Sequence, residues 1–246
     1  MKKLILITGA GRGIGAATAT LAARAGYDVA INFVHDEASA SAVCAKVEAL
    51  GAQAVLIQGD VSTAEGVQEI FAGVDASGIP LRAMVNNAGV VGQIMPFTEY
   101  TEERLRRTFD VNVLGAFLCA REAIKRMLAH GESGAIVNVS SAAARLGSPH
   151  EFVDYAASKG AIDTLTLGLA KEFGEAGIRV NAVRPGIIRT EIHAAAGDAG
   201  RIDRFAKMVP LQRAGEAEEA ARTILWLLSD DASYVTGALL DVAGGR

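Results

Sequence analysis

The sequence predicts a doubly wound α/β fold, in which a seven-stranded parallel sheet carries helices on both faces. Short apolar runs alternate with amphipathic helical patterns along the chain, as they do in successive βαβ units. Half of the 246 residues are hydrophobic but only 5% are aromatic, and this aliphatic composition suits parallel strands that are buried on both sides. No long linker, repeat or low-complexity tract interrupts the alternation, so we expect a single domain over residues 1–246.

The apolar runs define the strands in chain order, and the helical patterns fall between them. The expected strands are Leu4–Thr8, Val29–Phe33, Ala54–Gln58, Ala83–Asn86, Ala135–Ser140, Arg179–Val183 and Ala238–Val242. The expected helices are Ile14–Ala25, Ala38–Leu50, Thr63–Ser77, Thr101–His130, Tyr155–Glu175 and Glu216–Ser229. Right-handed crossovers between such strands give one open, twisted sheet of the Rossmann type.

Two local patterns add detail to this outline. Ser62 stands three residues before Glu65 at the start of an expected helix, and this spacing predicts a capping box. The stretch from Gly186 to Gly215 is polar, irregular and long for a loop in a compact domain. Because long loops of this kind tend to be functional, we expect it to form a lid over an active site.

The charge balance argues against a nucleic-acid-binding protein. The net charge is −4 and the pI is about 5.6, whereas a nucleic-acid surface needs clustered lysines and arginines. One expected helix does carry a row of arginines, interleaved with acidic residues. The members of this arginine row are Arg104, Arg106, Arg107, Arg121 and Arg126, and the acids are Glu102, Glu103, Asp110 and Glu122. We interpret it as a solvated, salt-bridged helix face.

The lengths of the apolar segments predict a soluble protein, and the two cysteines predict a cytoplasmic one. The apolar run near Met1 ends after four residues, at the first glycine loop. This run is too short for the apolar part of a signal peptide. No apolar stretch reaches the roughly 20 residues that a membrane helix needs. Cys44 and Cys119 lie far apart and show neither metal-ligand nor disulfide spacing. We therefore expect reduced thiols, no bound metal and no membrane segment.

The first chemical motif is a glycine loop that runs from Thr8 to Gly15 and reads TGAGRGIG. Gly9 permits a tight turn, Gly13 lets the backbone approach a pyrophosphate, and Gly15 allows close helix–strand packing. The loop follows the first expected strand and opens the first expected helix, which is the context that dinucleotide binding requires. A diphosphate would lie at the helix N-terminus, where free N–H groups and the helix dipole attract it.

The second motif is the pair Tyr155 and Lys159, four residues apart on one expected helix. Residues at this spacing lie on the same helix face. An ammonium group near a phenol favours the phenolate, so we expect Lys159 to lower the pKa of Tyr155 below its usual value of about 10. Such a tyrosine could donate and accept a proton near neutral pH.

Together these motifs resemble the short-chain dehydrogenase/reductase family in its single-domain form. The resemblance covers nearly the whole chain, with a departure at Ala243, where many relatives carry an aspartate. The positions that carry it are the glycine loop, Asn86-Asn87-Ala88-Gly89, Asn112, Ser140-Ser141, Tyr155 with Lys159, Arg184-Pro185-Gly186, Pro210-Leu211-Gln212-Arg213, Thr236-Gly237 and Gly244-Gly245.

The resemblance implies an oxidoreductase that moves a hydride between a nicotinamide cofactor and an alcohol/carbonyl pair. Tyr155 would be the general acid and base, and Lys159 would hold its phenolate form and bind the nicotinamide ribose. Ser141 would orient the carbonyl oxygen; Ser140 is the alternative, and the one-residue excess in spacing to the tyrosine suggests an insertion. Asn112 would hold a water molecule of the proton relay.

The resemblance also implies which residues contact the cofactor. These surround its phosphates, ribose, adenine and nicotinamide. They are Gly9, Arg12, Gly13, Ile14, Gly15, Asn32, Asp60, Val61, Asn87, Ala88, Gly89, Tyr155, Lys159, Pro185, Gly186, Ile188 and Thr190.

The end of the second strand favours NADP(H) over NAD(H). An acidic residue there would bind the ribose 2′-hydroxyl of NAD and repel a 2′-phosphate. That position is Phe33, preceded by Asn32, and neither is acidic. Arg12 can pair with a 2′-phosphate, and His35 could assist. Asp36, with Glu37 beside it, lies slightly further along and weighs against this interpretation.

Three functions remain open at this stage. One is the interconversion of a small secondary alcohol, such as a sugar or polyol, with its carbonyl, because residues 153–163 look like those of sugar-dehydrogenase-like relatives. Another is reduction of a 3-oxoacyl thioester, whose acidic acyl carrier protein could dock on a basic patch formed by Arg104, Arg106, Arg107, Lys125 and Arg126. The third, of another class, is a non-catalytic NADP-binding redox sensor. His150, Glu151 and Phe152, just before Tyr155, could contact a substrate.

The resemblance further implies a homotetramer. Relatives commonly pair through the long helices that follow the fourth and fifth strands. The apolar faces of Val113–Ala123 and Ala161–Ala170 are compatible with such pairing, although an intramolecular core explains the same faces.

Overall fold

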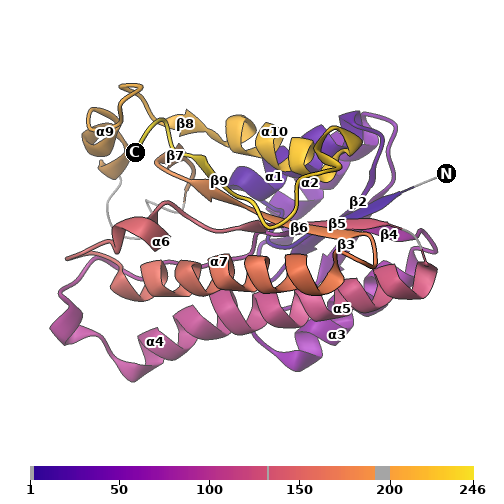
Figure 1. Ribbon diagram of the computed structural model, residues 1–246, viewed down its shortest axis with the longest axis horizontal. Helices are drawn as coiled ribbons and strands as arrows, with labels where there is room; N and C mark the ends of the chain where they lie inside the picture. Colours follow the sequence, from indigo (N-terminus) through magenta and orange to yellow (C-terminus); the bar gives the residue numbers. More distant parts are fainter. Residues whose placement is uncertain (1–2, 132, 192–199) are drawn as a thin grey trace.

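The computed structural model describes residues 3–131, 133–191 and 200–246 and confirms the doubly wound fold (Figure 1). Seven parallel strands form one sheet in the order β3-β2-β1-β4-β5-β6-β9. The strands are β1 (Leu4–Ile7), β2 (Asp28–Phe33), β3 (Ala54–Gln58), β4 (Leu81–Asn86), β5 (Gly134–Val139), β6 (Ile178–Pro185) and β9 (Leu239–Val242). Each expected strand is present, with its ends shifted by at most two residues.

Helices cover both faces of the sheet (Figure 1). One layer contains α1 (Gly13–Arg24), α2 (Glu37–Glu48) and α10 (Ala217–Leu228). The other contains α3 (Ala64–Ala76), α4 (Glu102–Phe109), α5 (Ala116–His130) and α7 (Val153–Phe173). Short helices lie at Phe97–Glu99 (η1), Ala143–Leu146 (α6), Arg201–Ala206 (α9) and Asp230–Ala232 (η3).

Alternation along each strand divides the core between the two helical layers. In β1, Ile5 and Ile7 pack with the α1/α2/α10 layer, whereas Leu4 and Leu6 pack with the opposite layer. All four of these side chains are fully buried. Successive side chains of a strand point to opposite faces, so a strand covered on both sides needs an unbroken apolar run, as the sequence shows.

Two expected local features are wrong, and a third differs from the expectation only in its regular structure. The start of α3 is not capped by Ser62 with Glu65: Thr63 occupies the N-cap and accepts a hydrogen bond from the Gly66 N–H (3.0 Å). The Ser62 hydroxyl donates instead to Asp60 Oδ1 (2.7 Å). The expected helix Thr101–His130 is also not continuous, because a π-helical turn over Asp110–Gly115 separates α4 from α5.

The third difference lies in the segment expected to be a lid. Its two ends form a small parallel pair, β7 (Ile188–Arg189) with β8 (Gly215–Glu216). α9 also lies within it. The segment therefore has more regular structure than its polar composition predicted, and its role as a lid stays a prediction. His193, a residue of that segment, lies outside the described residues.

The strand order reverses direction between β1 and β4. In open parallel sheets, ligands bind in the crevice outside the carboxyl ends of the strands at such a switch point. Across the described ranges, no helix combines the length and apolar character needed to cross a membrane.

Candidate active site

A cavity of about 920 Å³ lies at the carboxyl ends of the strands. Its walls come mainly from the segments that follow five strands, so residues far apart in sequence meet there. These lining segments are Gly9–Ile14 without Ala10, Phe33–Asp36, Asn87–Val91, Val139–Ala143 and Pro185–Ile188. The volume is in the range of pockets that bury whole ligands of cofactor size.

The glycine loop forms the floor of this cavity at the start of α1. Gly9 and Gly13 have positive φ angles of 62° and 55°, which residues other than glycine rarely adopt. A Cβ on Gly13 would approach Thr190 Cγ2 to 3.2 Å, so a side chain there would narrow the cavity. Arg12 occupies the N-cap of α1 and makes no side-chain capping bond, which leaves that helix end open to an anion. These residues fit the diphosphate of a dinucleotide.

Gly15 has the packing role that its position predicts and does not line the cavity. A Cβ on Gly15 would come within 2.6 Å of the Gly9 carbonyl oxygen and 2.7 Å of the Asn87 amide nitrogen. Asn87 Nδ2 donates to the carbonyl oxygens of Thr8 (2.9 Å) and Gly9 (3.0 Å). Gly15 therefore lets α1 approach the loop, and Asn87 fixes the loop from the β4 side.

Asn32 was expected to contact the cofactor, and the structure contradicts this. Its side chain is fully buried and is not part of the cavity wall. Asn32 Oδ1 accepts from the Gly9 N–H (3.2 Å), and Nδ2 donates to the carbonyl oxygens of Ile57 (3.3 Å) and Gly59 (3.0 Å). Asn32 thus positions the glycine loop from behind, because a buried amide must satisfy its own donors and acceptor.

Basic and acidic side chains both line the cavity near the end of β2. Phe33, Arg12, His35 and Asp36 all line it. The Asp36 carboxylate caps α2 by accepting from the N–H (3.0 Å) and the hydroxyl (2.6 Å) of Ser39. These hydrogen bonds, with a smaller contribution from the Arg12 guanidinium, lower the pKa of Asp36. The Asp36 carboxylate is therefore already engaged by its own helix.

Tyr155 and Ser141 meet at the other end of the cavity, and both line it. The Ser141 side chain lies near enough to the phenol to lower the pKa of Tyr155. Ser140, the alternative, lines the cavity too, but it is buried and its hydroxyl donates to the Lys159 carbonyl oxygen (3.1 Å). The geometry therefore favours Ser141 as the partner of a substrate oxygen. Its own Oγ also accepts from the Ala143 N–H (3.1 Å), which holds it in place.

Lys159 lies one turn further along α7 than Tyr155. Its Nζ is 5.6 Å from the centroid of the Tyr155 ring and donates to the Val139 carbonyl oxygen (2.8 Å). A Cβ on Gly89 would lie 3.4 Å from this Nζ and 3.4 Å from Asn112 Oδ1. The absence of a side chain at position 89 thus leaves room around the ammonium.

The expected pKa shift of Tyr155 is wrong in direction. Burial raises the pKa of Tyr155, and the Ser141 side chain opposes that rise only in part. Burial also lowers the pKa of Lys159 to about 8, against the attraction of Asp163. The prediction treated the pair as if it were in water, whereas desolvation of each charged form is the larger effect here.

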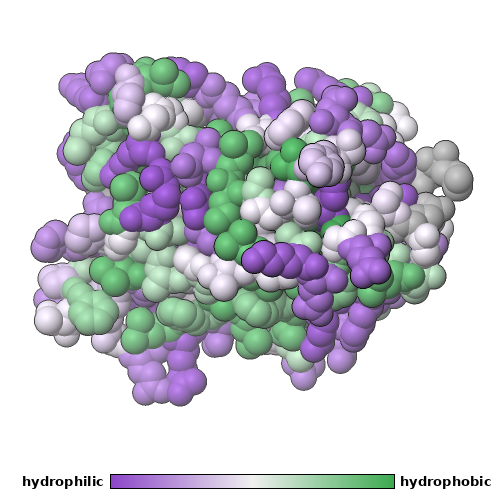
Figure 2. Space-filling model, viewed as in Figure 1, coloured by the Kyte–Doolittle hydropathy of each residue, from purple (hydrophilic) through white to green (hydrophobic). Residues whose placement is uncertain are grey.

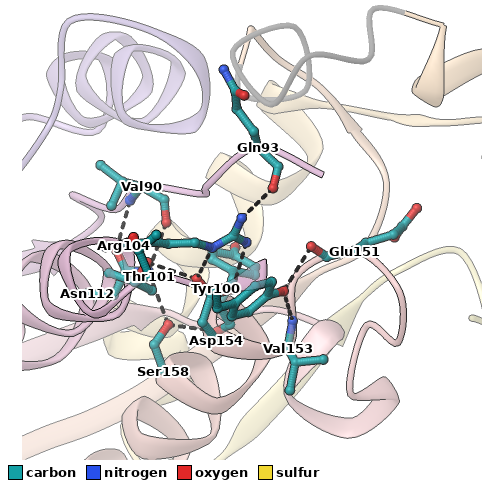
Figure 3. Close-up of polar contacts among 12 residues, drawn as sticks. Val90, Gln93, Tyr100, Thr101, Arg104, Asn112, Glu151, Val153, Asp154 and Ser158 are labelled. Carbon is teal, nitrogen blue, oxygen red and sulfur yellow. Dashed lines mark hydrogen bonds and ion pairs between the residues drawn. The ribbon is translucent and has the colours of Figure 1, made fainter. Parts of the chain in front are cut away.

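Asn112 lies in the π-helical turn and behind the cavity wall (Figure 3). It is buried, its Oδ1 accepts from the Val90 N–H (2.8 Å), and its Nδ2 donates to the Val90 carbonyl (2.9 Å) and to Ser158 Oγ (3.1 Å). Its side chain therefore ties the segment after β4 to α7. Single π-helical turns inside α-helices are common at functional sites, and this one interrupts an otherwise continuous helix.

The other expected cofactor contacts lie on the cavity wall. They are Ile14, Asp60, Val61, Asn87, Ala88, Gly89, Pro185, Gly186, Ile188 and Thr190. His150, Glu151 and Phe152 line it as well. Their position beside Tyr155 agrees with the expected substrate contact, which stays a prediction.

Sequence reasoning missed several wall residues. These are Val90, Val91, Arg107, Leu146, Ser148, Pro149, Phe205 and Arg246. Arg107 could have been found, since it belongs to the arginine row and lies 3.8 Å from the Asp60 carboxylate. No local pattern marks Phe205 or Arg246, because tertiary packing alone brings them to the cavity. No set of three or more His, Cys, Asp or Glu side chains is placed to hold a metal ion in the ranges that the structure covers.

Comparisons with known proteins agree with this geometry. The family model described as enoyl-(acyl carrier protein) reductase matches residues 9–246. The chain is 52% identical to an uncharacterized oxidoreductase of Escherichia coli (strain K12), YgfF, over 99% of both chains. It superimposes on the acetoin dehydrogenase YohF of Salmonella typhimurium with a TM-score of 0.90 at 36% identity, covering 100% of this chain and 97% of that one.

A further solved structure contains a nicotinamide cofactor. It is a 3-ketoacyl-(acyl-carrier-protein) reductase of Brucella melitensis complexed with NADH. The superposition covers 99% of this chain and 98% of the reductase chain, with a TM-score of 0.91 and 31% sequence identity.

Proposed function

The chain belongs to the short-chain dehydrogenase/reductase family, and we propose that it is an NADP(H)-dependent oxidoreductase that interconverts a small secondary alcohol and its carbonyl, with Tyr155 as general acid and base. The observation that carries the proposal is the position of Tyr155 and Ser141 together on the wall of a cavity whose other end is an open helix N-terminus. Such a pair can hold one oxygen of a substrate while a cofactor occupies the rest of the cavity.

The raised pKa of Tyr155 suits the reductive direction. A neutral phenol is the form that donates a proton to a carbonyl oxygen, and burial keeps Tyr155 in this form at physiological pH. The cofactor, when bound, supplies the hydride to the carbonyl carbon. Lys159 then stabilises the phenolate that remains, since its Nζ lies 5.6 Å from the centre of the ring. Ser141 orients the oxygen that receives the proton.

The charged groups of α4 and α5 favour a small substrate over a carrier-bound thioester. A docking site for an acidic carrier protein would need arginines with uncompensated charge. Members of the arginine row are instead paired within the chain: Arg106 with Glu102 (2.6 Å), Arg126 with Asp75 (2.7 Å), and Arg121 with Glu122 (3.1 Å). This is the salt-bridged face expected from the sequence.

A substrate panel assayed with both cofactors tests this function. We would follow oxidation of NADPH and NADH with 2,3-butanedione, acetoacetyl thioester and a set of ketoses, and reduction of the oxidised cofactors with sugars and polyols. Turnover of a small carbonyl compound, well above that of the thioester, is the expected result. Preferred use of the thioester would support the 3-oxoacyl reductase alternative. Cofactor binding without turnover of any panel member would support the sensor alternative.

We expect Arg12→Ala to lower kcat/KM for NADPH about tenfold and to leave that for NADH nearly unchanged. A charge-assisted hydrogen bond to a 2′-phosphate contributes roughly 1.5–3 kcal/mol, and NADH has no such phosphate. Arg24→Ala, at the opposite end of α1, is the matched control. Equal losses with both cofactors, or similar efficiencies of the unaltered enzyme with both, would refute the NADP(H) assignment.

We also propose that the enzyme is a homotetramer, supported by two separate apolar surfaces. One is formed by the π-helical turn, α5 and α7, where Leu114 (46%), Phe117 (45%) and Leu167 (39%) are exposed. The other contains Trp226 of α10 and Leu240 of the edge strand β9. In Figure 2 hydrophobic atoms gather on the side where α7 lies and again near β9. Two different two-fold interfaces are what a tetramer with dihedral symmetry requires.

Light scattering after size exclusion should give a mass about four times the 25.5 kDa of the chain. Phe117→Glu should reduce the mass to that of a dimer or monomer, because it places a charge in one of the two interfaces. Leu50→Glu, which alters an exposed leucine after α2, should leave the tetramer intact. A monomeric unaltered protein would contradict the proposal.

We place the enzyme in the cytoplasm, as the thiols suggest. Cys44 and Cys119 are free, and burial raises the pKa of Cys119 to about 12. Such a thiol stays protonated and inert, as expected of a reduced structural cysteine.

A further inference from the structure

A buried ion pair joins the start of α4 to the residue that precedes Tyr155. Arg104 Nε and Nη2 donate to Asp154 Oδ2 (2.8 Å) and Oδ1 (3.1 Å) in a bidentate arrangement. The side chains are 10% and 0% exposed. Burial alone would raise the pKa of Asp154, but the hydrogen bonds from Arg104, the Tyr155 N–H and Thr108, together with the charge of Arg104, outweigh it and hold the pKa below its usual value. The pair is therefore charged, and it stands apart from the exposed pairs of the arginine row.

The same guanidinium holds the segment that follows β4. Arg104 Nη1 donates to the Gln93 carbonyl oxygen (2.6 Å), and its Cζ lies 3.9 Å from the centre of the Tyr100 ring (Figure 3). A Cβ on Gly92 would lie 2.7 Å from that Cζ, so a side chain there would displace the guanidinium. This segment contains Val90 and Val91, which line the cavity. Arg104 thus fixes one wall of the site.

The Tyr100 hydroxyl holds the facing wall. It donates to the Glu151 carbonyl oxygen and accepts from the Val153 N–H, both at 3.1 Å (Figure 3). This wall includes Ser148 and His150, whose φ angles are 43° and 65°. Non-glycine residues persist in this region only where surrounding contacts hold them, and such strain gathers at functional sites. Tyr100 supplies two of those contacts.

The ion pair continues as a polar seam between two helices. Thr108 Oγ1 donates to Asp154 Oδ2 (3.2 Å), one helical turn after Arg104, and Asn112 donates to Ser158 Oγ one turn further (3.1 Å). Ser158 Oγ in turn donates to the Tyr155 carbonyl oxygen (2.7 Å). The seam therefore runs along the backbone turn that carries the Tyr155 side chain.

We propose that Arg104 and Tyr100 are positioning residues, which hold the two walls of the substrate end of the cavity and the first turn of α7 in the geometry that proton transfer by Tyr155 needs. The proposal rests on the proposed function of Tyr155. Replacing a buried ion pair by apolar residues is often neutral or stabilising, so the pair is poorly explained by fold stability alone. A displacement of about 1 Å at a reacting group can lower turnover about 10²-fold.

Three variants and one control separate positioning from general stability. Tyr100→Phe removes both wall hydrogen bonds and keeps the ring beneath the guanidinium. Arg104→Ala removes the pair, and Arg104→Lys restores the charge without the bidentate geometry. Arg106→Ala removes an exposed pair two residues away on the same helix and is the matched control. For each we would measure kcat and KM for 2,3-butanedione with NADPH, the Kd for NADPH, the Tm, and amide exchange over residues 88–101 and 148–154.

We expect Tyr100→Phe to lower kcat/KM about tenfold, mainly through KM, and Arg104→Ala to lower it about 10²-fold, with kcat affected as well. Arg104→Lys should lie between the unaltered enzyme and Arg104→Ala. The Kd for NADPH should stay within about twofold, because the glycine loop is untouched. Amide exchange should rise in residues 148–154 in Tyr100→Phe, and in both segments in Arg104→Ala. Arg106→Ala should change none of these values.

Folded variants with kcat/KM within twofold of the unaltered enzyme would overturn the proposal, as would a loss of NADPH affinity equal to the loss of kcat/KM. If Arg104→Ala does not fold, Tyr100→Phe decides the matter. An unaltered enzyme without activity on the panel would refute the proposed function instead. In that case amide exchange still decides whether the contacts of Arg104 and Tyr100 hold the cavity walls. Unchanged exchange in residues 148–154 of Tyr100→Phe would overturn this claim about the walls as well.

Discussion

Tyr155→Phe should lower kcat by about 10² to 10⁴ while NADPH binds as before. General acid–base catalysis by a positioned side chain contributes a factor of that size, and the substitution removes only the Tyr155 hydroxyl, on the cavity wall that Ser141 also lines. The ring keeps its shape and its contacts with the cavity wall. Steady-state kinetics with the best panel substrate and a fluorescence titration with NADPH measure the two quantities.

Tyr234→Phe is the control for this substitution, because Tyr234 is fully exposed to solvent. It should leave kcat and the Kd for NADPH unchanged. A Tyr155→Phe variant that retains kcat within about threefold would show that another group transfers the proton. A protein that binds NADPH equally well with and without the Tyr155 hydroxyl, and turns over nothing, would be the sensor instead.

The fold could be predicted because its signals are local and redundant. Each strand is a continuous apolar run, and β1 shows why, since Leu4 and Ile5 are buried against opposite helical layers. The glycine loop was recognisable because Gly9 and Gly13 need backbone conformations that other residues avoid. These constraints act on single residues or neighbours and can be read from one sequence.

The parts that escaped prediction depend on tertiary contacts. Asn32 was expected at the cofactor because of its place at a strand end, yet its amide is turned away to hold the glycine loop. The π-helical turn around Asn112 carries no local signature, because the same residues would form an ordinary helix turn. Arg104 looked like its neighbours in the arginine row, and only the fold brings buried Asp154 against it.

One signal could have revealed the polar seam. Arg104, Thr108 and Asn112 follow one another at intervals of four residues, and so do Asp154 and Ser158. Polar residues at this spacing lie on one helix face, and two such faces can pair. The pattern becomes meaningful only when the two helices are known to be in contact, which the sequence alone does not show.

Lys159→Met should abolish most turnover and also change how stability depends on pH. Turnover should fall by at least about 10²-fold, because the phenolate formed after proton transfer loses its nearby positive charge. Lys171→Met, which alters an exposed lysine of the same helix, should retain full activity. Activity of Lys159→Met close to that of the control would show that the charge at this position is not needed.

The stability effect follows from the cost of burying the Lys159 ammonium. Burial lowers its pKa from 10.5 to about 8 in the folded protein, so between these two pH values the unfolded chain binds more protons and stability rises with pH. At pH 7 the folded enzyme holds a buried ammonium at a cost on the order of 3 kcal/mol, and methionine removes this cost. The loss of the hydrogen bond to Val139 shifts the variant by an amount that does not depend on pH.

Urea unfolding at pH 7 and pH 9.5 therefore isolates the titration of one lysine. Relative to Lys159→Met, the unaltered enzyme should gain on the order of 2 kcal/mol between these two pH values. The other titrating groups are shared by both proteins and cancel in the difference. If the difference in the free energy of unfolding between the two proteins does not change with pH, or if the unaltered enzyme becomes relatively less stable as the pH rises, the Lys159 ammonium is not destabilised in the folded protein. The protein would then hold the Lys159 ammonium at no cost, and desolvation would not explain the electrostatics of the site.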